Sequence, residues 1–171
     1  MTREEKINDI LNALNIMYKI IGFEKNLLDI KILNNIDMDD SEFRSSDNSI
    51  LFKESYFNSA SLLELVSQAF HEARHFYQYV QINFKDKLKD NNLYIEDINL
   101  CNKWEYEFKN YIRPSSNIDT DYKFLDQNIE IDAMAFSYYL TQRLFKIEIY
   151  IPKYIEDRFM VRLNLIKSLY D

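Results

Sequence analysis

The sequence predicts an α+β fold that is mainly helical. Glycine occurs once and proline twice among 171 residues, so tight turns and helix breaks are few and long regular helices are favoured. Apolar residues recur at helical spacing in several long segments, whereas two shorter segments are rich in branched apolar side chains. Hydrophobic residues make up 47% of the chain, which is enough for a single domain over residues 1–171 with a buried core.

The first element expected is a helix over residues 3–21. Thr2 and Glu5 have the spacing of a capping box, in which each side chain accepts a hydrogen bond from the backbone of the other residue. Apolar residues then repeat every three or four positions, and Gly22 stands where a helix commonly ends. We expect this helix to be scaffold.

Two short strands are expected next, over residues 27–33 and 49–55. The first is rich in branched apolar residues, and the second alternates Ile50 and Phe52 with other side chains. Between them, residues 34–48 carry many aspartates, asparagines and serines, which predicts an acidic loop. These carboxylates lack the spacing and the glycine of an EF-hand, which argues against a calcium site.

A long helix is predicted from about Ser59 or Ser61 to Asn83, since Ser61 and Glu64 form a second capping box. At 100° per residue, one side of this helix carries an apolar stripe, and the two histidines of the chain fall opposite its centre. One side of the helix can therefore be buried in the core while the other lines a cleft. The stripe consists of Leu62, Leu65, Val66, Ala69, Ala73, Phe76 and Val80.

Within this helix lies the stretch His71-Glu72-Ala73-Arg74-His75, which has the form H-E-x-x-H. Residues i and i+4 of a helix project from one face, so both imidazoles can reach one metal ion. A glutamate directly after the first histidine can take a proton from a metal-activated water. His71 and His75 are therefore candidate metal ligands, and Glu72 is the candidate general base. Two exposed histidines on a polar face are the alternative.

Three further helices are expected, over residues 94–112, 127–145 and about 153–170, because apolar residues recur there at helical spacing. The polar residues 84–93 are predicted to be a solvated connection. Residues 114–125 begin with a proline and are predicted to be a loop that could border the cleft.

The helix over residues 127–145 carries Glu130 in its first turn, on the same face as Ala133 and Ser137. These small side chains would let the helix approach the H-E-x-x-H helix closely. A first-turn glutamate is also favoured by the helix dipole alone. Beside a pair of histidines, however, Glu130 can supply the carboxylate that a catalytic zinc site still lacks.

Charge and composition argue against several classes of protein. A net charge of -7 and a pI near 4.9 disfavour nucleic-acid binding, which needs a clustered positive surface. No run of about 18 apolar residues occurs, so no membrane span is expected. The lone Cys101 fits a reducing compartment, and the N-terminus has no signal-peptide pattern. A cytoplasmic location is expected, unless export uses no N-terminal signal.

The two motif windows together resemble the gluzincin zinc metallopeptidases, whose H-E-x-x-H helix is followed by Glu-x-x-Ala or Glu-x-x-x-Asp on a later helix. Here the second window runs from Glu130 to Ala133 and continues to Phe136. It is similar to the E-x-x-A-x-x-F-A helix of ImmA/IrrE-type peptidases and of small phage- and firmicute-type metallopeptidases. The resemblance implies a zincin-like fold, with the H-E-x-x-H helix packed against a small sheet and a second helix that brings a ligand.

The same resemblance implies that His71, His75 and Glu130 bind zinc, with water as the fourth ligand. Glu72 would be the general base and then the proton donor to the leaving amine. The substrate implied is a peptide or protein. In such peptidases the strand before the metal helix is often the sheet edge that pairs with extended substrate, a role expected here for residues 49–55.

Departures from the family pattern leave some roles open. Many relatives place Asp or Asn four residues after the ligand glutamate, where it can orient a histidine ring, but that position is Met134 here. Asp132 is the candidate for this role, or for an alternative ligand. Gln78 and Gln81 occupy the positions of the glycine and third histidine of a metzincin, which are therefore absent. Candidates for the transition-state donor follow from residue type alone: Tyr111, Tyr122 and Arg143.

Three functions are compatible with these patterns. The leading hypothesis is a zinc-dependent peptidase. The second is a binding or regulatory protein that holds metal on a gluzincin scaffold without turnover. The third is a helical protein without metal, in which Glu130 does not approach the histidines.

Overall fold

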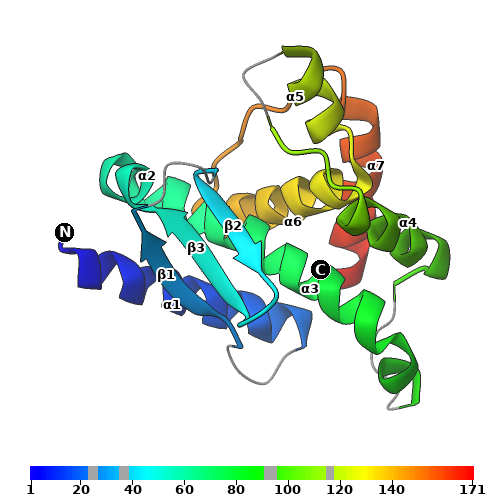
Figure 1. Cartoon of the computed structure of the whole chain (residues 1–171), viewed down its shortest axis with the longest axis horizontal. Coiled ribbons are helices and arrows are strands. Elements are labelled where there is room, and N and C mark those ends of the chain that lie inside the picture. The colour runs from blue at the N-terminus through cyan, green and yellow to red at the C-terminus, as the bar shows by residue number, and fades with distance from the viewer. Residues whose placement is uncertain (23–26, 35–38, 91–95, 115–117) are drawn as a thin grey trace.

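The computed structural model describes residues 1–22, 27–34, 39–90, 96–114 and 118–171, and it confirms a mainly helical α+β architecture (Figure 1). The helices are α1 (Arg3–Ile21), α2 (Glu54–Ser59), α3 (Leu62–Asp90), α4 (Ile98–Lys109), α5 (Ile118–Leu125), α6 (Asn128–Phe145) and α7 (Glu156–Tyr170). The strands are β1 (Asp29–Leu33), β2 (Ser41–Arg44) and β3 (Ser49–Lys53). Among the described helices, none combines the length and apolar character needed to cross a membrane.

Helix α1 has the two ends that the sequence predicts. The Thr2 hydroxyl accepts a hydrogen bond from the Glu5 backbone N–H at 3.2 Å, and the Glu5 carboxylate accepts one from the Thr2 backbone at 2.6 Å. Gly22 closes the helix in the left-handed conformation, with φ of 83°, which glycine adopts without steric cost. The predicted helix over residues 3–21 is confirmed.

The three strands form a mixed sheet in the order β1-β3-β2. β3 lies in the centre, parallel to β1 and antiparallel to β2. The prediction that residues 49–55 form the exposed sheet edge is therefore wrong: β3 is the buried central strand, and the chain turns into α2 at Glu54. The edge strand next to α3 is β2, in a segment for which an acidic loop was predicted.

Two other predictions for connecting segments are also corrected. Helix α3 continues to Asp90, so most of the polar stretch 84–93 belongs to the helix. Helix α5 forms inside the predicted loop 114–125, where Phe124 packs edge-to-face on Tyr111 with ring centroids 6.0 Å apart. In both segments, a polar composition permits a helix on a protein surface but does not predict one.

Helix α3 occupies the middle of the molecule and packs against α1, α4, α6 and β2 (Figure 1). Its predicted apolar stripe is mostly buried, with Leu65, Ala69 and Ala73 fully removed from solvent. These residues join side chains of α1, β3, α6 and α7 in one hydrophobic core. Burial of this stripe leaves the opposite side of α3 for the site described below.

Four buried charged side chains meet between helices α3, α6 and α7. Arg74 of α3 and Arg162 of α7 both donate hydrogen bonds to the Asp132 carboxylate of α6, at 2.9 Å and 2.6 Å. Both arginines also donate to Glu96, which precedes α4, at 2.9 Å and 2.8 Å. Removing charges from water costs several kcal/mol per ion unless each is paired. Here each charge has two opposite partners, so this buried charge cluster ties together α3, α6 and α7.

Arg162→Met should break this cluster and lower the free energy of unfolding by about 3–5 kcal/mol, because two carboxylates lose a buried partner. Arg158→Met is the matched control one helical turn earlier on α7. Arg158 pairs with Asp126 at the surface, where an ion pair contributes about 1 kcal/mol or less. Urea denaturation of both variants measures the difference. Equal losses would show that the buried cluster does not stabilise the fold.

Candidate metal centre

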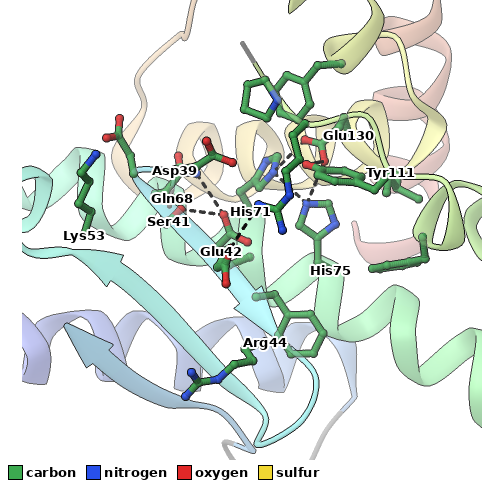
Figure 2. A pocket seen from close by; sticks show the side chains of 18 of the residues that line it. Asp39, Ser41, Glu42, Arg44, Lys53, Gln68, His71, His75, Tyr111 and Glu130 are labelled. Atoms are coloured by element: carbon green, nitrogen blue, oxygen red, sulfur yellow. Dashed lines mark hydrogen bonds and ion pairs between the residues drawn. The ribbon is translucent and has the colours of Figure 1, made fainter. Parts of the chain in front are cut away.

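His71, His75 and Glu130 converge at one wall of a pocket (Figure 2). The Nε2 atoms of the two histidines lie 3.1 Å apart. The Glu130 carboxylate places one oxygen 3.3 Å from His71 Nε2 and the other 3.4 Å from His75 Nε2. All three sequence-predicted ligand candidates therefore direct donor atoms at one point.

Helix geometry and small side chains explain this convergence. The two histidines follow from their i, i+4 spacing on α3. Helix α6 can approach α3 closely, because Ser137 is small enough to donate a hydrogen bond to the Ser67 carbonyl of α3 at 2.6 Å. Glu107 of α4 accepts a hydrogen bond from the Ile129 backbone N–H at 2.9 Å and so caps the start of α6. Glu130, the third residue of α6, is therefore held next to a fixed helix N-terminus.

The spacing of these donor atoms fits a metal ion better than it fits hydrogen bonds. A charge-assisted hydrogen bond between nitrogen and a carboxylate measures about 2.7–2.9 Å, shorter than both histidine–glutamate distances. Ligands about 2.0–2.1 Å from a tetrahedral zinc ion lie about 3.3 Å from one another. The observed separations of 3.1, 3.3 and 3.4 Å match that value. The donor set of two imidazoles and one carboxylate is also one that divalent metal ions accept.

Without metal, the proximity of His75 and Glu130 favours the charged form of each side chain. Burial disfavours a charged imidazole, but the adjacent Glu130 carboxylate outweighs it and raises the pKa of His75 to about 9. Burial would likewise raise the pKa of Glu130, but the two histidines hold it well below its usual range. Glu130 is thus ionised and ready to bind a cation, whereas His75 must give up a proton first.

Glu72 lies beside the two histidines and is held from a different direction. Its Oε1 accepts a hydrogen bond from the Ser41 hydroxyl of β2 at 2.7 Å and from the Gln68 amide at 3.2 Å. Both donors are neutral, and both go to the same carboxylate oxygen. The second oxygen, Oε2, accepts no hydrogen bond from the described residues, so it is the one that can exchange a proton with a bound molecule.

A cavity of about 740 Å³ opens over these residues, with β2 and the residues before it on one side (Figure 2). Tyr111 and Arg113, which follow α4, line the other side. The Arg113 guanidinium and the Glu42 carboxylate face each other across it at 3.8 Å. The candidate ligands therefore border a cleft with polar walls, and an edge strand runs along it.

The structure separates the three candidate transition-state donors. The Tyr111 hydroxyl donates a hydrogen bond to Glu130 at 2.7 Å, and burial together with that carboxylate raises its pKa, so the hydroxyl keeps its proton. Tyr122 is exposed and packs on Tyr154 instead. Arg143 binds the backbone of Tyr170 near the C-terminal end of α7. Of these three candidates, Tyr111 is the one that contacts a candidate metal ligand.

Asp132 takes part in the buried charge cluster, and its carboxylate does not join the three converging side chains. Asp132 is connected to His75 through Gln78, whose amide contacts both side chains. Gln78, Ser41 and Gln68 have site contacts that sequence analysis did not identify. Glutamine and serine carry no specific signal for such a role, and Ser41 lies in a strand that was not predicted.

Comparison of the chain with protein-family models, with curated proteins and with solved structures found no match. What the centre can do chemically therefore follows from its own residues. They can hold a divalent cation and place a carboxylate, Glu72, and a hydroxyl, Tyr111, beside it.

Metal binding should release the proton of His75. Because the pKa of His75 is about 9 in the metal-free protein, the ring is positively charged at neutral pH, with a proton on each nitrogen. It must lose one of these protons to bind a cation. Zinc affinity should rise about tenfold per pH unit up to about pH 9 and then level off. Isothermal titration at pH 7.5 in buffers of different ionisation enthalpy measures the proton count. A binding enthalpy that is independent of the buffer would contradict this expectation.

Proposed function

We propose that this protein is a zinc-dependent peptidase in which His71, His75 and Glu130 hold the metal and Glu72 is the general base. The observation that carries the proposal is the convergence of these three donors beside a glutamate with one oxygen left for proton exchange. A metal site that served only structure would not need such a carboxylate. A catalytic zinc site with three protein ligands leaves the fourth position open to water or substrate.

The cleft supports a peptide substrate. β2 is the edge strand of the sheet and lines the cavity, so its outer backbone groups can pair with an extended chain. A peptide bound in this way would pass over the histidines. This role belongs to β2 rather than to residues 49–55, which form the centre of the sheet.

In this proposal, Glu72 and Tyr111 have separate chemical tasks. When bound, zinc polarises a carbonyl and lowers the pKa of a water molecule. Glu72 would take a proton from the attacking water through Oε2 and transfer it to the nitrogen of the leaving amine. The Tyr111 hydroxyl, whose one proton is donated to Glu130 in this structure, would turn that proton to the negative charge that develops on the scissile carbonyl oxygen. The products are a carboxylic acid and a free amine.

Elemental analysis of the purified protein tests the metal site. The wild type should contain about one zinc ion per chain, and His75→Ala and Glu130→Ala should lose it, because each removes one of three ligands. Iron, manganese, cobalt and nickel are measured in the same samples, since two imidazoles and a carboxylate can also hold these metals. Absence of metal after zinc reconstitution would reject the peptidase.

Glu72→Gln tests the chemistry. This variant should keep its zinc and cleave peptides about 10²–10⁴-fold more slowly, the usual contribution of a general base. Each protein is incubated with a peptide library of mixed sequence, and mass spectrometry identifies the cleavage products whichever sequence is cut. Zinc binding without any Glu72-dependent cleavage would favour the alternative function, a regulatory protein that holds metal without turnover.

Tyr111→Phe should lower kcat by about 10²–10³-fold, the usual loss when one transition-state hydrogen bond is removed. The Michaelis constant should change little, because the ground-state substrate makes the same contacts. Tyr122→Phe is the matched control, since this exposed side chain lies outside the centre. Unchanged kcat in Tyr111→Phe would mean that the hydroxyl only holds Glu130.

A further inference from the structure

We propose that Gln78 is the residue that positions His75 for metal binding, by fixing which ring nitrogen carries the proton. Gln78 lies on α3, one turn after His75, and is fully buried. Its Oε1 is 2.9 Å from His75 Nδ1. The proposal rests on the metal site of the proposed function and does not depend on peptidase activity.

The surroundings of the Gln78 amide leave it one orientation. Its Nε2 lies 2.7 Å from the Asp132 carboxylate and 3.0 Å from the Ile129 carbonyl. Both of these groups are acceptors, so the amide must present its NH₂ group to them. The amide oxygen then has to face His75, because a rotation that exchanged the two ends would place that oxygen against two buried acceptors.

This orientation determines the state of the imidazole. Because the Gln78 oxygen can only accept, His75 Nδ1 must be the donor and carry a proton. In the neutral ring, Nε2 is then the unprotonated nitrogen. Nε2 is the atom that faces His71 and Glu130. When the ring gives up its second proton, the metal-binding lone pair of Nε2 is therefore the one that points at the centre.

The buried charge cluster stabilises the orientation of the Gln78 amide. Asp132 is fixed by Arg74 and Arg162, and so presents a stationary acceptor to Gln78. The gluzincin pattern places a carboxylate or amide at the position of Met134 for this purpose. In this chain, the histidine is oriented through an amide on its own helix, and the carboxylate acts one step further away.

Gln81→Leu provides a matched control for Gln78→Leu. Gln81 is also a buried glutamine on α3, three residues further along, and its Oε1 accepts a hydrogen bond from the Glu96 backbone at 3.0 Å. Both substitutions remove a buried amide of the same size beside the charge cluster. Of the two, Gln78 is the one that contacts His75, and it also donates to Asp132 and to the Ile129 carbonyl.

Zinc affinity, measured by competition with a chromogenic chelator, should fall about 10–100-fold in Gln78→Leu, as it does when the hydrogen-bond partner of a metal-bound histidine is removed. Gln81→Leu should stay close to the wild-type affinity, although thermal denaturation should show a loss of stability in both. Equal affinities in all three proteins would overturn the proposal while leaving the metal site intact. No zinc binding in the wild type would overturn both.

A second measurement needs no variant. The chain has two histidines, so long-range ¹H–¹⁵N spectra of the zinc-loaded wild type can assign the protonated nitrogen of each ring. His75 should carry its proton on Nδ1, protected from exchange with solvent by Gln78. A proton on Nε2 of His75, with zinc on Nδ1, would overturn the proposal even if Gln78→Leu failed to fold.

Discussion

Burial of four charged side chains constrains how the helices of this protein can pack. The cluster contains Arg74 from α3, Asp132 from α6, Arg162 from α7, and Glu96 from the segment before α4. A small shift of one helix would leave a charge unpaired in the interior, at a cost of several kcal/mol. The relative position of α3 and α6 is thus restrained near the candidate metal centre, whose donor atoms come from both helices.

The residues of the H-E-x-x-H motif on α3 point into different surroundings. The apolar Ala73 faces the core, Arg74 enters the charge cluster, and His71 and His75 face the cleft with Glu72. An α-helix turns 100° per residue, so consecutive residues necessarily point in different directions. Arg74 occupies a position that the H-E-x-x-H pattern leaves unspecified, yet it is the residue of the motif on which the packing of the helices depends.

The parts of the fold that depend on local sequence could be predicted. α1, α6, α7 and the start of α3 follow from helical spacing and end signals, and the two histidines meet because their spacing is local. β2 could not be predicted, because a four-residue strand forms only when β3 is present to pair with it. The contact of Ser41 was missed for the same reason, because it joins the site through Glu72, 31 positions away. Gln78 contacts His75 locally, but its amide is oriented by Asp132, 54 positions away.

Glu72 and Glu130 are chemically identical side chains, but their surroundings differ. Glu130 contacts a histidine with each oxygen and also accepts a hydrogen bond from the Tyr111 hydroxyl. These contacts keep it ionised and leave it no oxygen with which to move a proton. Among the described residues, Glu72 accepts hydrogen bonds through Oε1, from two neutral donors. A carboxylate held in that way can accept a proton and release it again, because neither step breaks an ion pair. The environment of each carboxylate thus favours Glu130 as the ligand and Glu72 as the base.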